Sequence, residues 1–312
     1  MRRGTIFKAF AAFAAAAVGS LVAPSVANAG PAPNAPRHAL LIGISNYEPP
    51  TVPTVGSAND ARDMHDALVR NGWPESSIRV LTDGDATMAN IRDGINWLVS
   101  NSSPNSFSIF HYSGHTKQIE SGYDDGDAED WDEYMWSVDN QFLSDGEFSN
   151  QMRAVKGQEW VNVSACEAAG FDDGISSPAH LFTAASREDQ KGYERYDTHR
   201  SIFTGLLTDA FLNKKGDSNH DGAISIQEAF AWAAEWAPKF SVNGSYGPQN
   251  PVMAGGDGTE WLLGAPSGAA ATNATPQQSL VPAGLIPPEL LRLLPSGLIP
   301  PGILPPVGAQ TP

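Results

Sequence analysis

The sequence has a single cysteine in 312 residues, Cys166, and this scarcity limits what can hold the fold together. One cysteine cannot form an internal disulfide, so the fold must depend on its hydrophobic core. Outside the cell a free thiol is exposed to oxidation and therefore needs a reason to be kept. Two interpretations follow: Cys166 is a catalytic nucleophile, or it is a buried and inert residue.

Positive charge is also scarce. The chain has 19 lysines and arginines against 35 aspartates and glutamates, which gives a formal net charge of −16 at pH 7. An acidic chain repels nucleic acid and anionic membrane surfaces, whereas its carboxylates attract cations. We therefore expect no nucleic-acid partner. The alternative role for this charge is solubility alone.

Long apolar runs are missing beyond the first 29 residues, so the mature chain is predicted to have no transmembrane segment. Residues 1–29 begin with three basic residues, continue with an alanine-rich apolar run from Ala9 to Val22, and end in a small-residue pattern at Ala29. This order is typical of a secretory signal peptide and predicts a secreted, extracellular protein. Its removal takes away three positive charges and no negative ones, so the net charge of −16 becomes −19.

The opposite end, residues 265–312, is rich in proline, alanine, glycine and leucine and repeats Gly-Leu-Ile-Pro-Pro at positions 284 and 297. Frequent prolines prevent a regular helix or central strand, so a disordered or semi-rigid tail is predicted, which can contact the envelope or a protein partner. The predicted organisation is a signal peptide (1–29), a linker (30–36), one folded domain (37–264) and the tail (265–312).

Within the folded domain, short apolar runs alternate with segments of helical periodicity. This alternation predicts an α/β fold with a mostly parallel central sheet and helices on both faces. The expected strands are Arg37–Ser45, Ile78–Thr82, Phe107–His115, Trp160–Val163 and His180–Ala185. The expected helices are Ala58–Asn71, Thr87–Ser100, Ser201–Leu212 and Ile226–Trp236.

Two side chains suited to thiol chemistry follow neighbouring predicted strands. His115 ends one strand, and Cys166 comes just after the next, 51 residues later. Reactive groups in parallel sheets gather at the carboxyl ends of strands. A free thiol is only slightly ionised at neutral pH, so a nearby imidazole is needed to activate it. We therefore expect Cys166 and His115 to act together, whereas His111, inside the strand, is not expected to take part.

Seven carboxylates fall within the twelve residues from Tyr123 to Tyr134. Mutual repulsion keeps such a run from packing unless cations or hydrogen-bond donors offset it. The run is predicted to be a loop, either simply solvated or involved in cation binding or substrate gating.

A second acidic segment, Asp217–Glu228, fills every position of an EF-hand loop, with glycine at the sixth position and glutamate at the twelfth. Calcium is the predicted cofactor, and the alternative is a metal-free turn rich in Asp and Asn. Extracellular calcium modules have dissociation constants of about 10⁻⁴ to 10⁻³ M, so millimolar calcium would fill such a loop. The predicted ligands are Asp217, Asn219, Asp221, the carbonyl of Ala223, Ser225 and Glu228.

Taken together, these segments resemble the caspase-like cysteine peptidases and, within them, the secreted bacterial metacaspase-like branch. A lone cysteine with a histidine about 50 residues upstream is a spacing already described for caspases. The resemblance runs from His38 to Val252 and depends on the order of several short segments: Leu40–Tyr47, Asn59–Ala61, Tyr112–His115, the Cys166 segment and Ala185–Arg187.

The resemblance implies cleavage of peptide bonds in a peptide or protein substrate, with Cys166 as nucleophile and His115 as its acid–base partner. It also implies that the backbone N–H groups of Thr116 and Cys166 hold the oxyanion. Some metacaspases have a separate regulatory calcium site, and by spacing Asp130, Asp145 and Asp173 fall near its positions.

The chain departs from the metacaspase pattern at three positions. Thr116 stands where glycine usually follows the histidine, Ser164 stands where an aspartate usually helps to bind a basic side chain, and Glu167 adds a negative charge beside the thiol. Asp60, which matches another acidic position of the specificity pocket, is present, so cleavage after basic residues is expected. The predicted function is a secreted, calcium-binding cysteine endopeptidase. The alternative is an inactive caspase-like module that binds calcium or protein.

Overall fold

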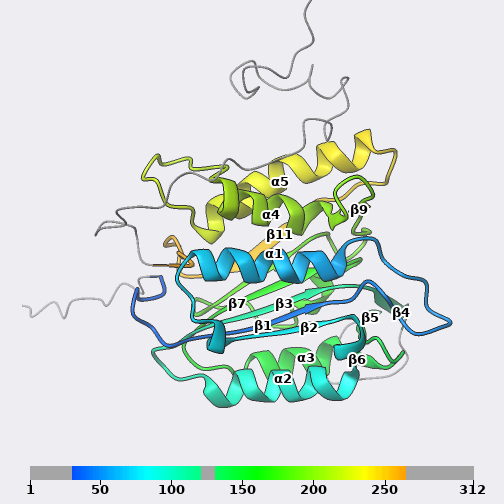
Figure 1. Ribbon diagram of the computed structural model, residues 1–312, viewed down its shortest axis with the longest axis horizontal. Coiled ribbons are helices and arrows are strands. Elements are labelled where there is room, and N and C mark those ends of the chain that lie inside the picture. The colour runs from blue at the N-terminus through cyan, green and yellow to red at the C-terminus, as the bar shows by residue number, and fades with distance from the viewer. Residues whose placement is uncertain (1–29, 121–130, 265–312) are drawn as a thin grey trace, which may run out of the picture.

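The computed structural model describes residues 30–120 and 131–264. The predicted signal peptide, the proline-rich tail, Asp130 and most of the acidic run lie outside the described residues. A six-stranded sheet forms the centre of the domain, in the order β11-β8-β7-β3-β1-β2 (Figure 1). Its strands are β1 (Arg37–Gly43), β2 (Ile78–Thr82), β3 (Phe107–Ser113), β7 (Gln158–Ser164), β8 (His180–Ala184) and β11 (Val252–Gly255).

Five of these strands are parallel, and only β11 runs antiparallel, to β8 at one edge. Every residue of β3 is buried, as expected for a central strand covered on both faces. The prediction of a mostly parallel sheet in a single α/β domain is confirmed. The five parallel strands bring their carboxyl ends to one edge of the sheet, where ligands bind in this architecture.

Helices cover both faces of the sheet (Figure 1). One face carries α1 (Ser57–Arg70), α4 (Ile202–Asn213) and α5 (Ile226–Asn243), and the other carries α2 (Met88–Asn101) and α3 (Asp145–Met152). Serine or threonine hydroxyls accept the hydrogen bonds that cap the starts of four helices, which explains why these helices begin where they do. The capping residues are Thr87, Ser144, Ser201 and Ser225.

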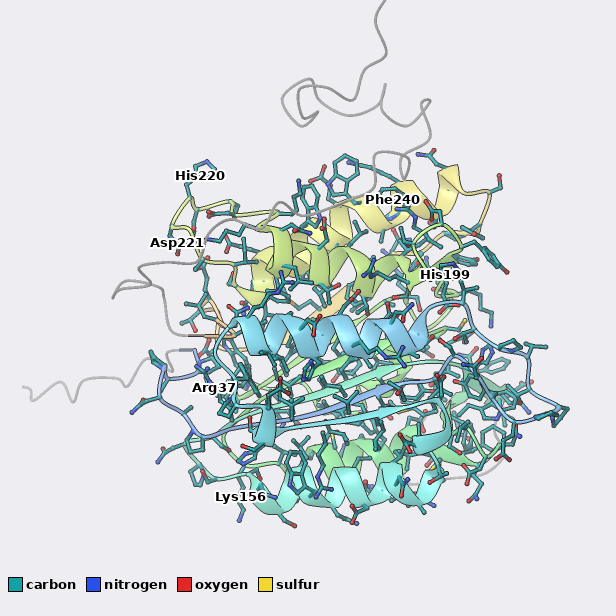
Figure 2. The ribbon with its side chains drawn as sticks, in the orientation of Figure 1. Arg37, Lys156, His199, His220, Asp221 and Phe240 are labelled. Carbon is teal, nitrogen blue, oxygen red and sulfur yellow. The ribbon has the colours of Figure 1, made fainter. Side chains whose placement is uncertain are left out.

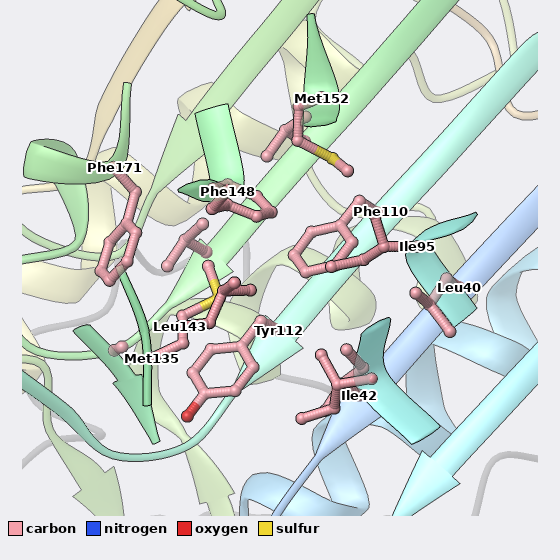
Figure 3. Close-up of a cluster of buried hydrophobic side chains, with 14 of the residues drawn as sticks. Leu40, Ile42, Ile95, Phe110, Tyr112, Met135, Leu143, Phe148, Met152 and Phe171 are labelled. Atoms are coloured by element: carbon pink, nitrogen blue, oxygen red, sulfur yellow. The ribbon is translucent and has the colours of Figure 1, made fainter. Parts of the chain in front are cut away.

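Two hydrophobic cores result, one on each side of the sheet. Figure 3 shows the core between the sheet and the helices α2 and α3, where Phe110 and Tyr112 from the sheet pack with Ile95 and Phe148 from the helices. The Phe110 and Phe148 rings lie 4.8 Å apart. Apolar burial of this extent on both faces holds the sheet rigid and so fixes the positions of the residues at its edge.

A second, three-stranded antiparallel sheet was not predicted. It consists of β4 (Thr116–Glu120), β5 (Trp131–Trp136) and β6 (Phe142–Ser144). Residues 131–134 of the acidic run therefore belong to a strand, not to a loop, and Glu133 is buried. The physical reason is that donors offset its charge, since Gln118 donates a 2.7 Å hydrogen bond to its carboxylate. Strand β4 begins directly after His115 and so ties that residue to the second sheet.

Short elements complete the fold. A small hairpin pairs β9 (Glu194–Arg195) with β10 (Arg200–Ser201), and single 3₁₀ turns occur at Glu75–Ser77, Asp83–Asp85 and Ala168–Phe171. Within residues 30–120 and 131–264, the search for a helix with the length and hydropathy needed to cross a membrane found none.

Candidate active site

His115 and Cys166 occupy equivalent places at the carboxyl edge of two neighbouring strands. Strands β3 and β7 pair in parallel, with Ser113 opposite Ser164 as the last pair of the ladder. His115 lies two residues beyond Ser113, and Cys166 lies two residues beyond Ser164. The strand register therefore brings the backbones of both residues to the same edge of the sheet.

Two tyrosines hold the peptide units around His115. The His115 N–H donates to the Tyr47 hydroxyl at 2.7 Å, and the Tyr112 hydroxyl donates to the His115 carbonyl at 2.5 Å. Gly114 permits this arrangement, because a Cβ there would lie 2.5 Å from the Tyr47 oxygen and 2.8 Å from the Tyr112 oxygen. The backbone of His115 is thus fixed from both sides before any substrate binds.

The imidazole of His115 is oriented by a backbone carbonyl. Its Nε2 lies 2.9 Å from the Val52 oxygen, and its ring packs against Tyr47 with 4.9 Å between centroids. A carbonyl oxygen only accepts hydrogen bonds, so Nε2 carries the proton in this contact. The other ring nitrogen, Nδ1, is then unprotonated in the neutral imidazole and able to take up a proton.

Cys166 is half-buried, and its Sγ lies 3.7 Å from the Gly192 carbonyl oxygen. Burial raises the pKa of the Cys166 thiol, and the neighbouring Glu167 carboxylate raises it further. Glu167 adopts a left-handed conformation with φ of 47° and pairs with the ammonium group of Lys191. The positive charge of Lys191 acts in the opposite direction on the thiol pKa and so offsets part of this effect.

A side chain that breaks the metacaspase pattern links the segments that carry His115 and Cys166. The Thr116 hydroxyl donates a 2.7 Å hydrogen bond to the backbone carbonyl of Cys166. Among the described residues, the imidazole of His115 and the thiol of Cys166 make no hydrogen bond to each other, because their partners are the carbonyls of Val52 and Gly192. The Thr116 contact therefore joins the two segments, although the imidazole and the thiol are not hydrogen-bonded to each other.

The segments after β3 and β7 each contain a backbone N–H group of interest, that of Thr116 and that of Cys166. Trp136 N–H donates to the His115 carbonyl at 3.1 Å, which is one of the two bonds of a hydrogen-bonded pair and lies directly beside the Thr116–Met135 pair of β4 and β5. Because such pairs alternate along an antiparallel ladder, the Thr116 N–H points away from β5. The Cys166 N–H has no acceptor among residues 30–120 and 131–264. These are the two groups that the sequence predicts as oxyanion donors.

The two predicted substrate-binding residues lie in one buried network. Asp60 accepts hydrogen bonds from the Ser113 hydroxyl at 2.7 Å and from the Ser201 N–H at 3.1 Å. The hydroxyls of Ser201 and Ser164 lie 3.0 Å apart, which connects Asp60 to the strand that leads to Cys166. Asp60 is fully buried, and this burial raises the pKa of its carboxyl to about 7.

Glu194 is a site residue that the sequence did not reveal. Its carboxylate accepts hydrogen bonds from the N–H groups of Val55 and Gly56, just before α1, and from the hydroxyl of Ser57, the first residue of that helix. Its negative charge raises the pKa values of both Asp60 and Cys166. No local motif marks this residue, because its role depends on contacts about 138 positions away in the chain.

The predicted calcium loop connects α4 to α5. Gly222 has a φ of 83°, as the sharp turn of such a loop requires, and Asp217 Oδ2 accepts the Gly222 N–H at 3.1 Å. Asp217 Oδ1 is buried without a hydrogen-bond partner, which leaves one oxygen available for a cation. Glu228 instead accepts bonds from the N–H groups of Ser218 and Ser225.

Glu228 would have to exchange these bonds for a metal ion before the loop holds one as predicted, so calcium at this loop stays a prediction. In the part of the chain that the structure describes, no group of three or more His, Cys, Asp and Glu side chains is arranged to hold a metal. The second predicted calcium set stays a prediction. Asp145 is the first residue of α3 and accepts the Gly146 N–H at 2.7 Å, and the Asp173 carbonyl accepts a bond from Arg153, just past the end of that helix.

Comparison with known proteins gives consistent matches. A sequence model of the caspase domain matches residues 36–249. Metacaspase-1 of Candida albicans is 36% identical over 124 residues, which cover 35% of this chain and 27% of that protein. Metacaspase-1A of Aspergillus oryzae is 40% identical over 113 residues, covering 33% and 26%. The chain therefore spans about a quarter of the length of these relatives.

A solved structure shows the same fold at low sequence identity. The crystal structure of protein GSU0716 from Geobacter sulfurreducens matches with a TM-score of 0.51 and 17% identity, covering 70% of this chain and 94% of that one. At this identity the match supports the fold alone.

Proposed function

Because this chain belongs to the caspase family of peptidases, we propose that it is a cysteine endopeptidase with Cys166 as nucleophile and His115 as acid–base partner. Membership confirms the family that the sequence resembles. The observation that carries the proposal is the β3–β7 register, which gives His115 and Cys166 equivalent places beyond Ser113 and Ser164.

The proposed reaction begins with proton transfer from the Cys166 thiol to Nδ1 of His115. The thiolate attacks the carbonyl carbon of the peptide bond, and the oxygen of that carbonyl takes the negative charge. The imidazolium then protonates the leaving amine as the C–N bond breaks, which gives a thioester. His115 next takes a proton from water as its oxygen attacks the thioester. The C–S bond then breaks to release the acid, and the imidazolium returns the proton to the departing sulfur, which restores the thiol.

Backbone donors are proposed to stabilise the oxyanion in both steps. The Thr116 N–H points away from the β4–β5 ladder, and the Cys166 N–H has no acceptor among the described residues. Donors that are already fixed in place before the reaction add most to the stabilisation of an oxyanion. The Thr116 hydroxyl supports this arrangement by holding the Cys166 carbonyl and therefore the segment whose N–H is needed.

The thiol must leave its present partner before it can react. The segment from Gln190 to Glu194 packs against the cysteine, since the Glu167 N–H donates to the Gln190 carbonyl at 2.8 Å and the thiol faces the Gly192 carbonyl. We propose that a bound substrate displaces this contact, after which sulfur and imidazole approach, because catalytic hydrogen bonds often tighten only in the substrate complex.

The raised thiol pKa also favours a second candidate, a catalytically inactive caspase-like module. Burial and Glu167 both keep the Cys166 thiol protonated at neutral pH. Under this alternative the domain binds calcium or a protein partner and cleaves no peptide bond. The two candidates differ in one measurable property, the reactivity of the thiol.

We propose a preference for cleavage after arginine or lysine. Asp60 and Glu194 place two carboxylates beside the nucleophile segment, and the charge of Glu194 adds to the burial that raises the pKa of the Asp60 carboxyl. A basic side chain that enters beside Asp60 would lower the pKa of its carboxyl and gain a charge-assisted hydrogen bond. Ser164, in place of an aspartate, would contribute a neutral hydroxyl.

Calcium is proposed as a structural cofactor. The ion would be held by the side chains of Asp217, Asn219, Asp221, Ser225 and Glu228 and by the carbonyl of Ala223. Its positive charge would offset the negative charge of these carboxylates. The buried and unpartnered Asp217 Oδ1 supports this assignment. The loop joins α4 and α5, so the ion would stabilise the helical layer over the sheet.

We also propose that the protein acts outside the cell, on the basis of the signal pattern in residues 1–29 and the mature charge of −19, which follows from the loss of three basic residues from a net of −16. Extracellular calcium is millimolar, which suits a loop of modest affinity. The proline-rich tail, 265–312, would contact the envelope or a protein partner.

A peptide library tests the proposed activity. The purified protein is incubated with peptides that differ at the residue before the cleaved bond, with 5 mM calcium or with chelator. We expect hydrolysis after arginine or lysine that is lost in Cys166→Ala. An absence of hydrolysis under all conditions, with a thiol no more reactive than free cysteine, would favour the inactive module.

A further inference from the structure

A cavity of about 610 Å³ lies far from the candidate active site. It opens between the start of β1, the carboxyl end of α1, the carboxyl end of α4 and the segment around Ala223. Figure 2 places Arg37, at the start of β1, on the left of the molecule, whereas β4, β5 and β6 lie on the right in Figure 1. The cavity is thus at the amino end of the parallel strands.

The charge of this cavity is opposite to that of the whole chain. Arg37, Arg70 and Lys214 line it, and none of the described residues that line it is an aspartate or glutamate. The whole chain has a net charge of −16, so three cations converging on one concave surface are unexpected for a merely solvated face.

Arg37 is built into the cavity wall. Its guanidinium donates to the Pro33 carbonyl at 3.0 Å and lies over the Trp73 ring, 5.6 Å from the centroid. Its Nε is buried and has no acceptor among the described residues. A buried charged donor without an acceptor is costly, so the arrangement favours an anionic acceptor supplied by a ligand.

Apolar side chains form part of the remaining wall. Phe211 and Leu263 are almost fully buried, and Ile224 and Leu262 complete this part of the lining. Lys214 donates to the Gly222 carbonyl at 3.1 Å, an acceptor that an entering anion would replace. A volume of about 610 Å³ is within the range of small-molecule sites, about 300 to 1,000 Å³.

We propose that this cavity binds an amphiphilic anion, a ligand with one carboxylate or phosphate group held by Arg37, Arg70 and Lys214 and an apolar body against Phe211 and Ile224. The anion would accept the unsatisfied Nε–H of Arg37. The apolar body would replace water on the apolar wall. This site is independent of the proposed peptidase chemistry.

Calorimetric titration with four probes tests the proposal: octanoate, octyl phosphate, 1-octanol and acetate. We expect saturable binding of octanoate or octyl phosphate, at least about tenfold tighter than that of 1-octanol or acetate, because the site needs both parts. The comparison of octanoate with octyl phosphate identifies the anionic group that the cavity prefers.

Variants locate the binding. Arg37→Gln and Arg70→Gln should each weaken the preferred probe about tenfold or more, whereas Arg62→Gln, on the exposed surface of α1, should leave it unchanged. Arg70 is exposed, so its variant remains informative if Arg37→Gln fails to fold. Equal binding of 1-octanol, equal losses in all three variants, or no saturable binding of either anion would overturn the proposal.

Discussion

The Thr116 hydroxyl donates a 2.7 Å hydrogen bond to the backbone carbonyl of Cys166. This bond connects the segment that follows β3 to the segment that follows β7, next to the proposed dyad of His115 and Cys166. The metacaspase pattern has glycine at this position, which would leave the carbonyl without this donor. Thr116 is therefore a positioning residue in the proposed mechanism, since it acts on the reacting atoms through the backbone of Cys166.

Replacing this hydroxyl tests its role. Thr116→Val keeps the shape of the side chain but removes the donor, so kcat/KM for a peptide substrate should fall about tenfold, with the loss mainly in kcat. Thr116→Ser keeps the donor and should restore activity to within about twofold of the original chain. Equal activities of the valine and serine variants would show that the hydroxyl does not position the nucleophile.

Glu167 should control the reactivity of the thiol. Burial is the largest cause of the raised pKa of the Cys166 thiol, and the Glu167 carboxylate is the second. Glu167→Gln should therefore shift the pH profile of alkylation by iodoacetamide to lower pH and increase the rate at pH 7 by roughly two- to fivefold. Lys191→Gln removes a charge that lowers this pKa, so it should shift the profile in the opposite direction. Shifts of the same sign in both variants would contradict this electrostatic account.

Asp60 should make stability depend on pH. Burial raises the pKa of its carboxyl to about 7 in the folded chain, above an unfolded value of about 3.9. The folded state thus holds this proton more tightly, and the stabilisation is complete below about pH 4 and lost as the pH rises through about 7.

The matched variant is Asp60→Asn, which does not titrate. Relative to it, the original chain should lose unfolding free energy between about pH 4 and 7, with a slope approaching 1.4 kcal/mol per pH unit. Urea unfolding of both proteins at intervals of half a pH unit measures this difference. A difference that stays constant, or that changes in the opposite direction, would exclude the buried and protonated carboxyl.

Calcium should stabilise the domain through the Asp217–Glu228 loop. With a dissociation constant of about 10⁻⁴ to 10⁻³ M, 5 mM calcium would add roughly 1 to 2 kcal/mol, or about 2 to 9 °C in Tm. Asp217→Asn should abolish most of this shift, whereas Asp209→Asn, in α4 outside the loop, should retain it. An identical shift in both variants, or none in the original chain, would exclude this loop as the calcium site.

Much of the main sheet could be predicted from the sequence because the inner strands β1, β3, β7 and β8 are almost entirely buried and therefore rich in apolar residues. The edge strand β11 is partly exposed and was not predicted. The 51-residue spacing of His115 and Cys166 is also the register of β3 on β7, in which Ser113 pairs with Ser164. The spacing therefore corresponds to the equivalent places of the two residues beyond their strands. The EF-hand pattern likewise marked the turn at Gly222, where φ is 83°.

The second sheet could not be predicted in this way. Strand β5, Trp131–Trp136, contains Asp132 and Glu133, both buried, so it lacks the alternation of apolar and polar residues that marks an ordinary strand. The position of Glu194 at the start of α1 and the bond from Thr116 to Cys166 depend on residues far apart in the chain. Long-range contacts of this kind leave no short sequence signal.

Covalent labelling with an arginyl chloromethyl ketone, followed by mass spectrometry, tests most directly whether Cys166 and His115 act as a pair. We predict that the probe modifies Cys166 and that His115→Ala slows this labelling by at least about a hundredfold, whereas His65→Ala, on the outer surface of α1, leaves it unchanged. Labelling of Cys166 at the rate of free cysteine, unaffected by His115→Ala, would contradict the account.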